Sequence, residues 1–138
     1  LTLFFSATMP AEIGKLAAEL LRDPVRVEVT PVASTVDRVS QRVLHVEAGG
    51  KRGLLAGLLR GPTVERVLVF ARTKHGADKV VKMLEQYALS ANAIHGNKSQ
   101  GQRENALAQF KSGRAPILVA TDIAARGIDV AGVSHVVQ

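Results

Sequence analysis

The residues whose types could do chemistry gather in three short segments, each of which follows an apolar run. They are residues 71–74 (ARTK), residues 95–103 (HGNKSQGQR) and residues 121–129 (TDIAARGID). Hydroxyl, amide and guanidinium groups donate hydrogen bonds to phosphate oxygens, and carboxylates accept them from sugar hydroxyls or pair with arginine. These residue types and spacings are therefore suited to contacts with a ligand that carries phosphate groups.

Two of the segments contain a predicted helix start. Ser99 and Gln102 form a capping-box pattern, which predicts a helix from Gln100 with Gln100 and Arg103 on one face of its first turn. Free N–H groups, a positive dipole end and an arginine fork suit a polynucleotide phosphate. Thr73 could cap another helix and offer its hydroxyl to phosphate. The alternative is that both are ordinary capped surface helices, and each pattern alone favours that alternative.

The third segment combines two acids, an arginine and a glycine directly after a buried strand. Thr121 can donate to a phosphate oxygen, Gly127 permits a turn that other residues resist, and Asp129 can accept from sugar hydroxyls. The alternative is a solvated loop in which Arg126 pairs with Asp129 or Asp122, which stabilises a surface little.

The elements that position these segments are predicted from periodicity. Apolar runs alternate with amphipathic helices, which indicates a parallel sheet covered on both faces, with ligands at the carboxyl ends of the strands. The predicted strands are 42–46, 66–71, 91–95, 116–121 and 133–137, and the predicted helices are 51–59, 74–87, 100–110 and a short turn at 122–126. Before them we expect a strand at 1–7, a helix after Pro10, a strand at 25–29 and an aperiodic linker.

Composition narrows the class of protein. The 138 residues suffice for one domain with a core, and the net charge of +6 favours an anionic partner. No cysteine is present and the histidines are scattered, so a zinc site is not expected. No apolar run approaches the ~20 residues that span a membrane, so we expect no membrane partner and a cytoplasmic location.

Four motifs along the chain together resemble those of the DEAD-box RNA helicases. Residues 121–129 (TDIAARGID) resemble motif V of that family, residues 5–10 (FSATMP) motif III, and residues 68–74 (LVFARTK) motif IV. Gln100 and Arg103 fit the Q-x-x-R of motif IVa, and residues 95–100 (HGNKSQ) are similar to the RhlE-type bacterial members. The motifs follow the family order, and the resemblance covers the whole chain.

The resemblance implies an α/β fold, namely a RecA-like parallel sheet flanked by helices. Residues 1–31 would be the last strand and helix of a first lobe, residues 32–38 the linker, and residues 39–138 a second lobe that stops before motif VI. Both ends of the chain fall inside apolar strand-like runs, so we expect a fragment of a longer protein.

The resemblance also implies roles for individual residues. Ser6 and Thr8 would couple the lobes, Asp129 would meet the ATP ribose, and Arg126 would lie at the lobe interface. The RNA-facing set would be Thr73, Gly96, Gln100, Arg103, Thr121 and Gly127. The chain contains no phosphate-binding G-x-x-x-x-G-K-[ST] loop and no D-E-A-D sequence. ATP and Mg²⁺ would therefore act in the full-length parent, and this chain should lack catalytic residues, ATPase activity and tight ATP binding.

The expected partners are RNA, held by its sugar–phosphate backbone, and the missing first lobe. Residues 1–31 could dock on the second lobe or be exchanged with another copy, because their apolar face needs a partner. Three other classes stay open: a superfamily 2 DNA translocase, a RecA-like lobe that serves only as an RNA-binding or scaffold module, and a nucleotide-binding adaptor of flavodoxin-like fold.

Overall fold

The computed structural model describes residues 1–6, 9–28, 39–125, 128 and 130–138. The whole predicted linker, residues 32–38, and the site candidates Thr8, Arg126, Gly127 and Asp129 lie outside these residues. The chain divides into two units, Leu1–Val43 and Leu44–Gln138. The predicted boundaries of the linker between the lobes, at residues 31 and 38, are not tested by the described residues.

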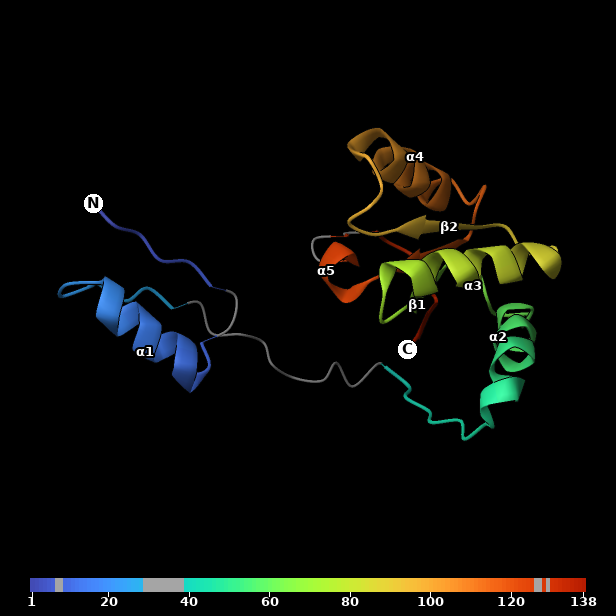
Figure 1. Cartoon of the computed structure of the whole chain (residues 1–138), viewed down its shortest axis with the longest axis horizontal. Helices are drawn as coiled ribbons and strands as arrows, with labels where there is room; N and C mark the ends of the chain where they lie inside the picture. Colours follow the sequence, from blue (N-terminus) through green and yellow to red (C-terminus); the bar gives the residue numbers. More distant parts are fainter. Residues whose placement is uncertain (7–8, 29–38, 126–127, 129) are drawn as a thin grey trace. The chain divides into compact units, whose positions relative to one another are not determined.

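The second unit contains most of the regular structure (Figure 1). Its elements are, in chain order, the 3-10 helix η1 (Ala48–Gly50), α2 (Lys51–Leu59), β1 (Val67–Phe70), α3 (Lys74–Gln86), β2 (Ala91–Ile94), α4 (Gln100–Lys111), β3 (Ile117–Ala120), α5 (Asp122–Ala125) and β4 (His135–Val137). The 3-10 helix η1 was not predicted from the sequence. Each of the other elements falls within about two residues of its predicted range, which is the usual uncertainty of helix and strand ends.

The four strands form one sheet in the order β2-β3-β1-β4, and every neighbouring pair is parallel. All four residues of the central strand β3 are buried, as expected for a strand covered on both faces. The predicted parallel α/β sheet is therefore confirmed.

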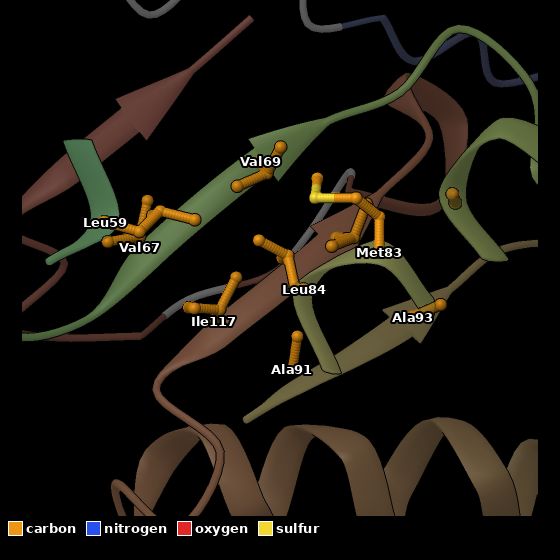
Figure 2. Packing of buried hydrophobic residues seen from close by; sticks show 10 residues of the cluster. Leu59, Val67, Val69, Met83, Leu84, Ala91, Ala93 and Ile117 are labelled. Carbon is orange, nitrogen blue, oxygen red and sulfur yellow. The ribbon is translucent and has the colours of Figure 1, made fainter. Parts of the chain in front are cut away.

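The two faces of the sheet carry separate hydrophobic clusters because side chains alternate along a strand. On one face, α2 and α3 pack against the odd-numbered residues of β1 and β3, and Leu84 of α3 is fully buried there (Figure 2). On the other face, Phe110 of α4 is fully buried against Leu118 and Ile94. Figure 1 shows α3 and α4 on opposite sides of the sheet.

The first unit contains the helix α1 (Ala11–Leu20), which begins directly after Pro10 as predicted. No residue of α1 is buried, and Leu16 and Leu20 are exposed. Nowhere among the residues that the structure describes is a helix long and apolar enough to cross a membrane.

Three predicted strands are wrong over the residues that can be compared. Residues 1–6, 25–28 and 42–46 have no regular structure. The described residues of these runs take part in no strand pair, and Val25 and Val43 are 92% and 81% exposed. An apolar run becomes a strand only where a neighbouring strand accepts its backbone hydrogen bonds.

Candidate nucleic-acid interface

The carboxyl ends of three neighbouring strands meet at one edge of the sheet. Phe70 of β1 and Ile94 of β2 both align with Ala120 of β3. Beyond the strands, the Ala71 amide donates to the Ala120 carbonyl at 2.8 Å, and the Thr121 amide donates to the Ile94 carbonyl at 3.3 Å. The three segments that follow these strands, beginning at residues 71, 95 and 121, therefore leave the sheet side by side.

The segment after β1 leads into α3 through a side-chain cap. The Thr73 hydroxyl accepts the Gly76 amide proton at 3.0 Å, which satisfies one free donor of the first turn. The next residue, Lys74, extends from this turn and donates from Nζ to Oδ1 of Asn97 at 2.9 Å. This bond joins the start of α3 to the loop after β2.

The segment after β2 leads into α4 through the predicted capping box. The Ser99 hydroxyl accepts the Gln102 amide proton at 3.3 Å, and the Gln102 side chain accepts the Ser99 amide proton at 2.9 Å. The Gln100 side chain donates to Glu104 at 2.9 Å. The capping box is confirmed, and it fixes the direction in which the first turn of α4, with Arg103, leaves the loop.

His95 is the buried polar residue at the end of β2, with 2% of its surface exposed. Its Nε2 lies 3.0 Å from Oδ1 of Asp78 in α3, and its Nδ1 lies 3.3 Å from the Asn97 amide, which donates to it. The same Asp78 oxygen lies 3.0 Å from Nζ of Lys98. The hydrogen bond from His95, followed by that from Lys98, holds the pKa of Asp78 below its usual value.

An open cleft of about 340 Å³ lies where the three segments meet, and it is lined by Arg72, Lys74, Gly96, Arg103, Thr121, Ile123 and Ala124. Three of these residues are cations, and none of the described lining residues carries a carboxylate. A groove lined by one sign of charge concentrates ligands of the opposite sign. The cleft therefore suits an anionic ligand.

The cleft brings together Gly96, Arg103 and Thr121 of the predicted site residues. Thr73 and Gln100 are neighbours of lining residues but do not line the cleft, and their side chains bond to Gly76 and Glu104. Ser6 belongs to the first unit and to a segment without regular structure. Thr8, Arg126, Gly127 and Asp129 lie outside the described residues.

Four lining residues were not predicted from the sequence: Arg72, Lys74, Ile123 and Ala124. Arg72 and Lys74 flank the predicted Thr73, and Ile123 and Ala124 lie between the predicted Thr121 and Arg126. Their place in segments that directly follow a strand was the available signal. The Asp78–His95 contact was missed as well, and the sequence carries no pattern that pairs these two residues. Among the residues that the structure describes, no group of three or more His, Asp or Glu side chains could hold a metal ion.

The fold and the cleft define an α/β domain of the kind that places its ligand site at the carboxyl ends of parallel strands. Residues 50–138 match the helicase conserved C-terminal domain, and the chain belongs to this family.

Solved structures of several DEAD-box helicases resemble the chain. Dbp5 of S. cerevisiae, bound to RNA and ADP BeF3, is 26% identical with a TM-score of 0.80 over 96% of this chain and 34% of its own. Prp28 of Chaetomium thermophilum, bound to ADP, is 37% identical with a TM-score of 0.63 over 95% of this chain and 31% of its own. The E. coli protein SrmB, bound to the regulator of ribonuclease activity A, is 37% identical with a TM-score of 0.60 over 64% of this chain and 52% of its own.

These similarities confirm the RecA-like fold of a DEAD-box helicase C-terminal lobe. The chain spans about half of the SrmB chain and about a third of the other two.

Proposed function

We propose that this chain is part of an ATP-dependent RNA helicase of RhlE-like type, and that its cleft holds RNA by the sugar–phosphate backbone. The observation that carries the proposal is the convergence of Arg72, Lys74 and Arg103 on one cleft at the carboxyl ends of β1, β2 and β3. The cations come from two different loop–helix junctions, so they offer charge over the length of the cleft.

Backbone contacts explain the types of residue in the cleft. Sequence is read by contacts to base edges, whereas stacking on aromatic rings holds bases of any identity. None of the described lining residues is aromatic, so the cleft offers bases no stacking platform. Cations and backbone amides, such as that of Gly96, instead contact phosphates and sugars. The Dbp5 structure, which contains RNA, supports RNA over DNA as the strand that this cleft holds.

The test of this proposal is the substitution Arg103→Ala. It should weaken binding of the chain to single-stranded oligouridylate and oligoadenylate by the same factor, because the contact is to phosphate and not to bases. The salt dependence of binding should fall by about one phosphate contact between about 50 and 200 mM salt. Fluorescence anisotropy with labelled RNA measures both quantities.

Arg114→Ala is the matched control, because Arg114 is an exposed arginine outside the cleft and its loss removes the same charge. Equal losses for the two variants, or an unchanged salt slope for Arg103→Ala, would contradict a phosphate contact by Arg103. The same experiment with single-stranded DNA separates the two strand types: tighter binding of DNA would favour the alternative of a superfamily 2 DNA translocase.

ATP and Mg²⁺ would bind to the longer protein of which this chain is a part. Asp129 would meet the ATP ribose, Arg126 would lie at the interface between lobes, and Ser6 and Thr8 would couple nucleotide binding to lobe closure. A first lobe with the phosphate-binding loop would be the partner that completes this site, and the parent would act in the cytoplasm. If no such lobe is encoded beside this segment, the alternative of an RNA-binding or scaffold module holds instead.

A further inference from the structure

A hydrogen-bonded network ties α3 to the loop between β2 and α4. Asp78 is its centre, since one carboxylate oxygen lies 3.0 Å from both His95 Nε2 and Lys98 Nζ. The imidazole is buried, with 3% of the side chain exposed, whereas the Asp78 side chain is 39% exposed. A buried donor that lost its acceptor would be left unsatisfied, so the His95–Asp78 contact holds the loop in place more firmly than a surface ion pair would.

The imidazole also fixes the backbone of the loop. Nδ1 of His95 accepts the Asn97 amide proton, so Nε2 carries the ring proton and donates it to Asp78. The His95 carbonyl accepts the Lys98 amide proton at 3.0 Å, and Lys74 bonds to the Asn97 side chain. Gly96 lies inside this set of bonds, and it lines the cleft.

We propose that Asp78 is a positioning residue for the cleft: through His95 and Lys98 it fixes the loop that presents the Gly96 backbone and the first turn of α4, with Arg103, to the RNA backbone. The inference rests on the proposed function, because it assumes that the cleft holds RNA. Asp78 itself does not line the cleft.

The negative charge of Asp78 makes the expected direction of the change in RNA affinity informative. Removal of a carboxylate from a basic protein lowers its repulsion of a polyanion, so on electrostatic grounds RNA should bind slightly more tightly. A positioning role predicts the opposite result, because the loop and the start of α4 lose their attachment to α3. The two effects can therefore be separated by direction as well as by size.

The experiment compares Asp78→Ala with Glu85→Ala in the whole chain. Glu85 lies on the same face of α3, and both carboxylates border one groove of about 230 Å³. Within the described residues, Glu85 makes no ion pair. We expect Asp78→Ala to bind oligouridylate about three- to tenfold more weakly than the unsubstituted chain. Glu85→Ala should bind equally or up to about twofold more tightly.

A conservative variant and a double substitution distinguish positioning from general loss of structure. Asp78→Asn keeps an oxygen that accepts the His95 proton, so it should recover most of the affinity and keep the Nε2-protonated form of His95 in ¹⁵N spectra. In the Arg103→Ala background, Asp78→Ala should have a smaller effect than alone, because both changes remove the same contact. Circular dichroism checks that each variant is folded.

The outcomes separate the two proposals. An Asp78→Ala affinity equal to that of Glu85→Ala, with Arg103→Ala still impaired, would overturn the positioning role and leave the proposed function intact. Fully additive effects of Asp78→Ala and Arg103→Ala, or Asp78→Asn as weak as Asp78→Ala, would also overturn it. An Arg103→Ala chain that binds RNA normally would overturn the proposed function, and the positioning role with it.

Discussion

Asp78 accepts hydrogen bonds from His95 and Lys98, and these bonds hold its pKa below the usual value. A carboxyl group whose pKa is lower in the folded state stabilises the fold above its unfolded pKa of about 3.9. That stabilisation is lost as the pH falls through the still lower pKa of the folded state. The Asp78 carboxylate should therefore stabilise the domain at neutral pH and not in strong acid.

The corresponding measurement is denaturant unfolding of the unsubstituted chain and Asp78→Ala over a range of pH. The difference in free energy of unfolding should be fully present near neutral pH and should shrink as the pH falls below about 4. Glu85→Ala, whose carboxylate makes no ion pair within the described residues, is the control and should show a small difference throughout. A difference for Asp78→Ala that grows in acid would contradict the assignment.

Local signals specify the helices α3 and α4 and place their starts at the cleft. Thr73 and Ser99 cap the two helices, and the apolar faces of the helices cover opposite sides of the sheet. α1 differs, because no residue of it is buried, and Leu16 and Leu20 are exposed. An amphipathic helix gains most of its stability from packing, so we expect the apolar face of α1 to pack against a partner surface.

We propose that residues 1–31 find this partner on the second lobe or on another copy of the chain. Light scattering at increasing concentration should then show self-association, or else residues 1–31 should resist protease in the monomer. Substitution of the exposed Leu16 and Leu20 by serine should abolish either behaviour, whereas substitution of the exposed Lys15 and Glu19 should not. A monomer whose first 31 residues are digested rapidly would refute the proposal.

For the molecule as a whole, we expect that ATP hydrolysis requires a first lobe in addition to this chain. Phosphoryl transfer needs a phosphate cradle, a metal ion and a cationic clamp together, and the sequence contains no G-x-x-x-x-G-K-[ST] loop. We expect no phosphate release above background from the chain with RNA and ATP. In a longer protein with both lobes, Asp129→Ala should lower ATP-dependent unwinding more than RNA binding without nucleotide.

A phosphate-release assay and a duplex-unwinding assay measure these two quantities. RNA-stimulated ATP turnover by the chain, at a rate that survives further purification, would contradict the first expectation. Equal losses of unwinding and of nucleotide-free RNA binding in Asp129→Ala would contradict the contact with ribose. Arg114→Ala in the longer protein serves again as a control for the removal of an exposed charge.

The sequence by itself determined the features that depend on near neighbours along the chain. The period of apolar residues gave the parallel sheet and its helices, and the spacing of Ser99 and Gln102 gave the capping box. The place of Gly96, Arg103 and Thr121 directly after strands also indicated that they would meet.

Only the tertiary structure decided which side chains turn toward the cleft and what holds them there. Gln100 and Arg103 share a helix start, yet Gln100 bonds to Glu104 while Arg103 lines the cleft. Asp78 and His95 are 17 positions apart, and they meet because α3 packs across the sheet beside the end of β2. The apolar runs at residues 1–6, 25–28 and 42–46 are not strands for the same reason: pairing depends on a neighbour in space, which local periodicity does not encode.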